Sequence, residues 1–318
     1  MSISHIPSAS NQPVSTDRPI DNPLLHARSV SRALNIVGDR TALLLVYWVF
    51  LGVYRFVELQ SKTGLSKSLV SNRIKRLEQE GVLERHAYQG GRFEYHLTPM
   101  GKDLYDVALA IIRWDKQWHY SRECPTHNLV HQHCGKQFIP EPVCTFCAGA
   151  IDARSCDWHF GPGQPDAELS NSGRSRRSRI SPSALHAEHP IMDRSLEILG
   201  DRWTALTIAA AFYRVTTFNG FQQALGIATN ILSDRLGRLV AMDIFIERRH
   251  SRSEYRLTEQ GLALFPVIVS LMRWGDAWLV DTSGPSLILI HRRCQQVLVP
   301  SMRCDQCHEA LQFGDFHV

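Results

Sequence analysis

The stretch that decides the fold is FNGFQQALGIATNILSDRLGRLVAMDIFIERRHSRSEYRLTEQG, which runs from Phe218 to Gly261. It predicts a short helix over 218–225, a turn containing Gly226, and a second helix over 229–242. Apolar residues recur at helical spacing in that second helix, while polar and basic residues lie off the apolar stripe. Two short β segments joined by a basic tip follow. Together these features predict a winged helix-turn-helix, whose second helix can enter the major groove of DNA.

The same pattern occurs earlier in the chain. The two copies match at an offset of 162 residues before the hairpin and of 160 residues after it. The matched residues include Gly38, Asp39 and Arg40 against Gly200, Asp201 and Arg202, and Trp114, Trp118, Cys134, Cys144 and Cys147 against Trp274, Trp278, Cys294, Cys304 and Cys307. Because rare Trp and Cys residues take part at constant spacing, we interpret the chain as a tandem duplication.

The length and composition of the chain limit its domain number and its class. A length of 318 residues fits two domains, and a formal net charge of +4 with a pI near 8.6 is compatible with nucleic acid without requiring it. Residues 1–22 contain no apolar core of a secretory signal. The longest apolar run, Ala42–Tyr54, is shorter than the roughly 20 residues that span a bilayer. The sequence therefore predicts a cytoplasmic protein without a membrane partner.

We predict an α+β fold that is mainly α with small β-wings, in six segments. These are a disordered tail over 1–23, a first winged helix-turn-helix over 24–121, a Cys/His tail over 122–151, a flexible basic linker over 152–185, a second winged helix-turn-helix over 186–282 and a Cys/His tail over 283–318. The linker carries Arg174, Arg176, Arg177 and Arg179. This cluster either attaches to phosphates without reading sequence or keeps the linker solvated.

The DNA contacts are predicted from the outward residues of the two recognition helices and from the hairpins. Side chains of this kind donate to phosphates and base edges. In the first half they are Lys67, Ser68, Ser71, Asn72, Arg73, Lys75, Arg76 and Arg92, and in the second half they are Thr229, Asn230, Ser233, Arg235, Arg238, Arg248, Arg249 and Arg252. Arg73 and Arg235 occupy matching positions, and each either contacts DNA or holds its helix against its own domain.

Each half ends in a Cys/His segment with the spacing HxxC, nine residues, CxxC. The first contains His131, Cys134, Cys144 and Cys147, and the second contains His291, Cys294, Cys304 and Cys307. Three thiolates and one imidazole form a tetrahedral zinc set, so we predict one zinc-ribbon-like site in each tail and two zinc ions per chain. The alternatives are metal-free β-turns with inert thiols and, less favoured, a redox CxxC. Cys124 and Cys156 lack counterparts and are interpreted as structural or free thiols.

The long helices predicted over 98–119 and 258–279 carry more apolar surface than one small domain can bury. They form either a dimerisation surface or ordinary core. Trp114 and Trp118 lie about one turn apart on the first of these helices, which fits both alternatives.

The second half resembles the HxlR-type family of bacterial winged helix-turn-helix transcription regulators. The resemblance rests on Leu199-Gly200-Asp201-Arg202-Trp203, Leu225-Gly226-Ile227-Ala228-Thr229-Asn230, Glu254-Tyr255-Arg256-Leu257-Thr258 with Gly261, and Trp274-Gly275. The first half matches more loosely, with Thr41 in place of the Trp. The resemblance implies a DNA-binding regulator that pairs through its first and last helices.

The chain departs from the family pattern in two respects that bear on function and on the turn before the wing. Some members sense electrophiles or oxidants through a cysteine near the start of the first helix, where this chain has Arg28 and Pro190. We therefore do not expect that mode of sensing. Asp243 replaces the usual Gly before the second hairpin, and Asp tolerates the left-handed conformation that such a turn needs.

The leading hypothesis is a sequence-specific regulator that binds double-stranded DNA as an intramolecular pseudo-dimer or as a homodimer. The alternative is a protein-interaction module that does not read DNA sequence. We do not expect an enzyme or an organic cofactor, because the sequence contains no paired carboxylates, nucleophile elbow or phosphate-binding Gly loop.

Overall fold

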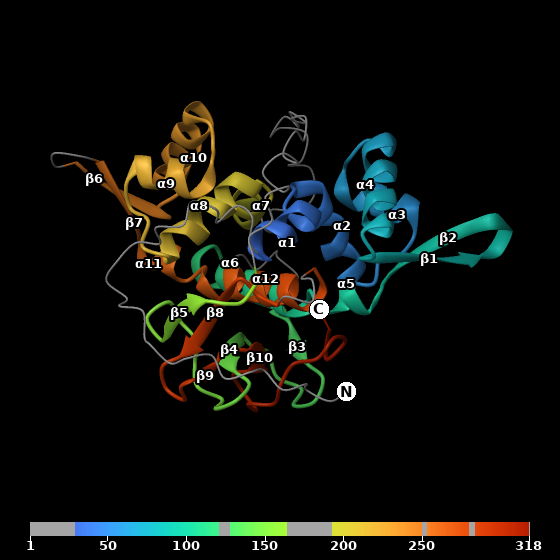
Figure 1. The fold of residues 1–318 in the computed structure, drawn as a ribbon. Helices are drawn as coiled ribbons and strands as arrows, with labels where there is room; N and C mark the ends of the chain where they lie inside the picture. The colour runs from blue at the N-terminus through green and yellow to red at the C-terminus, as the bar shows by residue number, and fades with distance from the viewer. Residues whose placement is uncertain (1–28, 121–127, 164–192, 250–252, 280–283, 318) are drawn as a thin grey trace.

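The chain forms two halves of the same design, seen in a computed structural model that describes residues 29–120, 128–163, 193–249, 253–279 and 284–317. Each half contains a winged helix-turn-helix, as the sequence predicts (Figure 1). The first half comprises α1 (Ser29–Val37), α2 (Arg40–Phe50), α3 (Phe56–Thr63), α4 (Lys67–Gln79), β1 (Leu83–Tyr88), a 3-10 turn (Gln89–Gly91), β2 (Arg92–Leu97), α5 (Pro99–Lys102) and α6 (Tyr105–Trp118). The second half comprises α7 (Asp193–Leu199), α8 (Arg202–Phe212), α9 (Phe218–Leu225), α10 (Thr229–Ala241), β6 (Phe245–Arg249), β7 (Ser253–Leu257), α11 (Glu259–Leu262) and α12 (Phe265–Trp278).

Local capping sets the helix boundaries. The Asp39 side chain accepts the backbone N–H of Ala42 and begins α2, as predicted, and Asp201 accepts that of Thr204 and begins α8. The helix-turn-helix turns use Gly64 and Gly226, whose φ angles of 64° and 60° lie in the left-handed region. These glycines end α3 and α9 without strain and let the chain turn into α4 and α10.

The wings are antiparallel hairpins of different length. β1 pairs with β2, and β6 pairs with β7. Asp243 does adopt the left-handed conformation before the second wing, with a φ of 57°. A Cβ at Gly261 would lie 2.3 Å from the carbonyl oxygen of Ile244, and the matching Gly101 is equally confined by Val82. Glycine at these two positions therefore lets the start of each last helical segment pack against its wing.

The two halves pack against each other through helices. α1 lies along α12, α12 contacts α6, and α6 contacts α7. The indole N–H of Trp114 donates to the carbonyl of Gln260 at 2.9 Å, and that of Trp274 donates to the carbonyl of Met100 at 2.8 Å. Each of these tryptophans thus lies in the core and reaches the opposite half. Much of the apolar surface of α6 and α12 is therefore core that the two halves of the chain share, and the dimerisation alternative stays a prediction.

The tails form a β lobe on the other side of these helices (Figure 1). Its strands are β3 (Val130–His131), β4 (Pro140–Cys144), β5 (Cys156–Phe160), β8 (Leu287–His291), β9 (Gln296–Val297), β10 (Pro300–Cys304) and β11 (Phe316–His317). β4 pairs with β10, β3 with β11 and β5 with β8, always in antiparallel fashion. Each of these three pairings joins the two halves.

Strand β5 corrects the predicted start of the linker. The segment expected to be flexible from residue 152 instead contributes Cys156–Phe160 to the lobe. Buried Cys156 lies opposite His291, as Phe316 lies opposite His131. Cys156 therefore has a positional counterpart that the sequence match missed, because the residue type differs. Cys124, the tail over 1–23 and the basic cluster at residues 174–179 lie outside the described residues.

Within the described part of the chain, no helix is long and apolar enough to cross a membrane.

Candidate nucleic-acid interface and metal centres

The two recognition helices present polar and basic faces to solvent. α4 and α10 project from the same side of the molecule, opposite the β lobe (Figure 1). Their apolar stripes are buried, through residues such as Leu77 in α4 and Leu239 in α10. The exposed members of the predicted contact set are Lys67, Ser68, Ser71, Asn72 and Lys75 on α4 and Thr229, Asn230, Ser233 and Arg238 on α10.

The matching arginines of the two helices point into their own domains. Arg235 donates from Nε and Nη2 to the carboxylate of Asp201 at 2.8 and 2.7 Å, and its side chain is only 12% exposed. Arg73 pairs with Asp39 at 2.9 Å and is 16% exposed. Burial acts to raise the pKa of Asp201, but the hydrogen bonds and charge of Arg235 outweigh burial and hold that pKa below its usual value. Of the two alternatives, the geometry favours anchoring of the helix over DNA contact.

Three further members of the contact set are partly engaged. Arg76 donates to the carbonyl of Asn35 at 2.6 Å, which ties α4 to α1. Arg238 pairs with Asp234 at 3.2 Å, and the hydroxyl of Thr229 accepts from Gln222 at 2.9 Å. These contacts hold the side chains along the helix surface, while Arg238 and Thr229 stay exposed.

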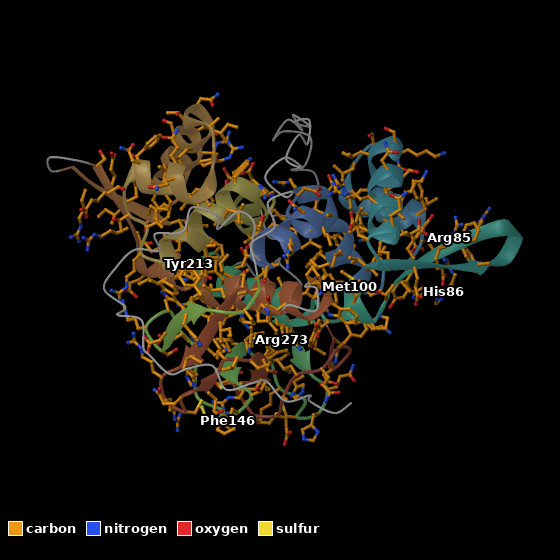
Figure 2. All side chains as sticks on the ribbon, in the orientation of Figure 1. Arg85, His86, Met100, Phe146, Tyr213 and Arg273 are labelled. Atoms are coloured by element: carbon orange, nitrogen blue, oxygen red, sulfur yellow. The ribbon has the colours of Figure 1, made fainter. Side chains whose placement is uncertain are left out.

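The wings carry basic residues outward. Arg92 and Arg248 are exposed, whereas the side chain of Arg249 and all of Arg252 lie outside the described part. Figure 2 shows Arg85 on the first wing, where its guanidinium lies 5.0 Å from the centre of the Phe93 ring. Arg85 lies opposite Tyr95 in the hairpin and is absent from the predicted contact set. The signal in the sequence was its place between Glu84 and His86, because consecutive polar residues are typical of an exposed strand.

The eight predicted metal ligands gather into two clusters, but with a different pairing from the one predicted. The first cluster contains His131, Cys134, Cys304 and Cys307, and the second contains Cys144, Cys147, His291 and Cys294. Each cluster therefore takes the HxxC pair of one half and the CxxC pair of the other. The prediction of one complete site within each tail is wrong, although the ligand residues are the ones predicted.

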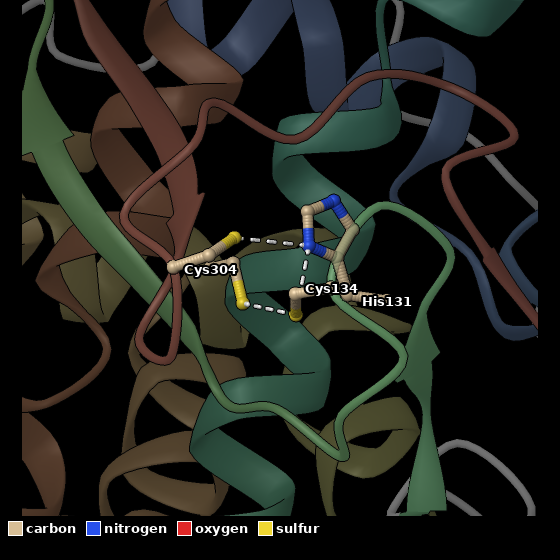
Figure 3. A group of neighbouring side chains, drawn as sticks. His131, Cys134 and Cys304 are labelled. Carbon is tan, nitrogen blue, oxygen red and sulfur yellow. Dashed lines mark hydrogen bonds between the residues drawn. The ribbon is translucent and has the colours of Figure 1, made fainter.

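The two clusters have nearly the same geometry. In the first cluster, His131 Nδ1 lies 3.5 Å from Cys134 Sγ and 3.3 Å from Cys307 Sγ, and the thiols of Cys134 and Cys304 are 3.9 Å apart (Figure 3). In the second cluster the equivalent separations are 3.5, 3.3 and 4.0 Å, from His291 Nδ1 to Cys294 and Cys147 and between Cys294 and Cys144.

These separations fit a tetrahedral zinc site. Zn–S bonds of about 2.3 Å and Zn–N bonds of about 2.0 Å place neighbouring ligand atoms about 3.5 to 3.8 Å apart. All ligand atoms of each cluster lie within 4.8 Å of one another. Both histidines are buried, as are Cys144 and Cys304, so half of each donor set is shielded from water, and the other four cysteines are half-buried.

Tight turns bring each pair of ligands together. The N–H of Gly135 donates to the carbonyl of His131 at 2.8 Å, and Gln295 and His291 repeat this bond at 2.8 Å. The N–H of Gln306 donates to the thiol sulfur of Cys304 at 3.4 Å. The backbone N–H of Lys136 lowers the pKa of the Cys134 thiol, whereas burial raises that of Cys304 to about 11 despite the N–H of Gln306. N–H groups aimed at sulfur stabilise thiolates, which are the form that binds metal.

Comparison with known proteins finds a family match for both winged helix-turn-helix units. The family model described as HxlR-like helix-turn-helix matches residues 36–123 and 198–283. An HTH-type transcriptional regulator of Mycobacterium tuberculosis is 41% identical over 137 residues, which cover 42% of this chain and 87% of that protein. The HTH-type transcriptional regulator YvaP of Bacillus subtilis is 34% identical over 90 residues, 27% of this chain and 83% of that protein. A solved structure described as a transcription factor, PA1607, is 32% identical, covers 44% of this chain and 95% of its own, and has a TM-score of 0.36.

Since the two matches of the family model span more than half of the residues, this chain belongs to the HxlR-like helix-turn-helix family of transcriptional regulators rather than to an enzyme family, and it carries two tandem copies of the family's domain.

Proposed function

We propose that this regulator binds a specific double-stranded DNA site through α4 and α10 of a single chain, which act as an intramolecular pseudo-dimer. The observation that carries the proposal is the projection of both exposed, polar helix faces from the same side of one packed body (Figure 1). A winged helix-turn-helix dimer places its two recognition helices about one DNA turn apart, roughly 34 to 36 Å. Here one chain supplies both helices. We place its action in the cytoplasm, where bacterial DNA lies.

The two half-sites should differ in sequence. At the offset of 162 residues, Lys67 matches Thr229, Asn72 matches Asp234 and Lys75 matches Gly237. The α4 face is therefore more basic than the α10 face. Asn reads adenine edges through two hydrogen bonds, whereas Asp accepts from cytosine, so Asn72 and Asp234 favour different bases. An asymmetric operator follows from these differences.

Affinity selection from random double-stranded DNA with the purified protein tests the proposal. We expect an enriched site with two unlike halves separated by about one helical turn. Binding should weaken steeply as salt rises, because Lys and Arg side chains displace counterions from phosphates. If no sequence is enriched at any salt concentration, the protein-interaction alternative replaces this proposal.

We also propose that the two clusters bind zinc, with two ions per chain. The support is the three-thiolate, one-imidazole donor set and the ligand separations, repeated in both clusters. Metal analysis after purification without chelator should give about two zinc ions per chain. Protein that folds and carries no metal would contradict the zinc proposal without affecting the proposal on DNA.

A further inference from the structure

The composite make-up of the clusters has a geometric cause. In each tail the HxxC pair precedes an extended strand, and the CxxC pair begins at the last residue of that strand. β4 spans Pro140–Cys144, so its two ends lie about 13 Å apart at roughly 3.4 Å per residue. A straight strand of this length separates the HxxC pair of its own tail from the CxxC pair at its far end. One tail alone, in this conformation, does not close a site.

The antiparallel partner strand supplies the missing ligands. Cys144 lies opposite Pro300, and Cys304 lies opposite Pro140. The beginning of each strand is thus beside the end of the other, and the end carries the first cysteine of the partner's CxxC pair. The HxxC pair that enters β4 therefore meets Cys304 and Cys307, and the pair that enters β10 meets Cys144 and Cys147.

The far ends of the tails are exchanged in the same way. Phe316, at the end of the second half, stacks on Tyr105 of α6 with ring centres 5.9 Å apart. Trp158, at the end of the first tail, packs edge-on against Tyr213 at 5.9 Å. The end of each tail therefore packs on the helices of the opposite half, and three strand pairs of the lobe join the two halves.

The lobe is also fastened to the helices that join the halves. Arg113 of α6 donates to the carbonyl of Pro140 at 2.9 Å, and Lys116 donates to the carbonyl of Phe138 at 3.2 Å. α6 and α12 both contact β10. Closing the metal sites thus constrains the same two helices that carry the winged units.

We propose that the two metal centres are clasps shared between the halves, so that the free energy of metal binding holds the halves together. In structural zinc sites the free energy of metal binding is free energy of folding. Here each ion would bridge ligands far apart in sequence, such as Cys147 and His291, 144 residues apart, and Cys134 and Cys304, 170 residues apart. Metal therefore links the two domains as well as organising the local turns. The inference builds on the zinc proposal above and is independent of DNA binding.

Paired cysteine variants of the full chain test the shared ligation. Cys134→Ser with Cys304→Ser removes two thiols from one cluster, and zinc should fall from about two ions per chain to about one. Cys134→Ser with Cys144→Ser also removes two thiols, but one from each cluster, and both ions should be lost. The two variants are matched controls for each other. The reverse pattern would mean that each tail binds its own metal and would overturn the proposal.

A cleavable linker tests the clasp itself and does not depend on replacing a ligand. A protease site is inserted between residues 164 and 192, outside the described residues, and the cut protein is sized with zinc present and after chelation. With zinc, the two fragments should elute together at the mass of the uncut chain. After chelation the fragments should associate more weakly: the protein concentration at which half of them are dissociated should rise at least about tenfold. Added zinc should rejoin them. Fragments that hold together equally well with and without metal would overturn the clasp.

Discussion

At the scale of single residues, one carboxylate in each half both caps a helix and forms an ion pair. Asp201 caps α8 by accepting from the N–H of Thr204 at 2.9 Å and also binds Arg235 of α10. Asp39 and Arg73 repeat the arrangement in the first half. The angle between the core helix and the recognition helix is therefore held by an ion pair at the N-terminus of the core helix.

Replacing Arg235 with Ala should lower the free energy of unfolding by about 1 to 3 kcal/mol, because it leaves the half-buried Asp201 carboxylate without its ion-pair partner. Arg238→Ala, on the exposed side of the same helix, should change stability by less than about 0.5 kcal/mol and should instead weaken DNA binding. Urea unfolding of both variants, beside a salt titration of DNA affinity, separates the two roles. Unchanged stability of Arg235→Ala would contradict the anchoring role.

A half-buried carboxyl at the contact between the halves makes stability depend on pH. Burial raises the pKa of Asp276 to about 6, and the Ser29 hydroxyl of α1 donates a short hydrogen bond to it. The pKa of an unfolded Asp is about 3.9, so between pH 4 and 6 the folded state binds more protons than the unfolded state. The contribution of this group to stability therefore falls as pH rises through that window.

Asp276→Asn should remove this loss, which amounts to about 3 kcal/mol across the window. Asn keeps an acceptor for Ser29 and carries no charge to desolvate. Chemical unfolding at pH 4, 5, 6 and 7 measures the effect as a flatter dependence of stability on pH in the variant. Parallel curves for the variant and the wild type would rule out this role of Asp276.

At the scale of elements, two helical glycines with opposite surroundings make a matched pair. A Cβ at Gly275 in α12 would lie 2.4 Å from the carbonyl oxygen of Ser29 in α1. A Cβ at Gly237 in α10 would meet no atom within 4 Å. At position 275 glycine lets α1 and α12 approach closely. At position 237 glycine serves no packing contact and lowers the stability of α10.

Gly237→Ala should raise the free energy of unfolding by about 0.5 to 1 kcal/mol, since Ala favours a helix interior more than Gly does. Gly275→Ala should lower it by about 1 to 3 kcal/mol, because the new methyl group displaces the backbone of α1. Thermal unfolding of both variants without DNA gives the comparison. Equal stabilisation by both substitutions would mean that α1 and α12 are not in close contact.

At the scale of the whole molecule, two matching contacts between helices of opposite halves, α1 with α12 and α7 with α6, are unequal. α1 lies along Gly275 of α12, whereas the matching position in α6 is Asp115, which accepts from Ser195 of α7 at 3.0 Å. The duplicated domains have thus diverged at the surface they share. This asymmetry favours pairing of unlike halves over pairing of like halves.

Light scattering should accordingly give a mass near 36.1 kDa for the free protein, the mass of one chain. In the complex with DNA, one operator should carry the same mass of protein, that of a single chain. The exchanged tails can in principle pair between two chains as well, which would give twice that mass, about 72 kDa, and a protein with four recognition helices. A stable species of the larger mass would replace the intramolecular arrangement with that dimer.

The sequence by itself determined the elements of the winged helix-turn-helix units, the duplication and the donor atoms. Apolar periodicity located α4 and α10, Asp39 and Asp243 predicted a cap and a turn that the structure contains, and the repeated spacing of Cys and His identified all eight cluster residues. These features are local. Hydrogen bonding and side-chain periodicity within a few residues are sufficient to specify them.

Only the tertiary structure decided which of these residues meet. Spacing along the chain predicted that each HxxC pair joins the CxxC pair nearest in sequence, but an extended strand keeps the two pairs apart and an antiparallel partner from the other half brings the alternative pair close. The anchoring of Arg235 on Asp201 and the pairing of β5 with β8 likewise join segments distant in sequence. Such contacts depend on how whole elements pack, and no local pattern of residues specifies them.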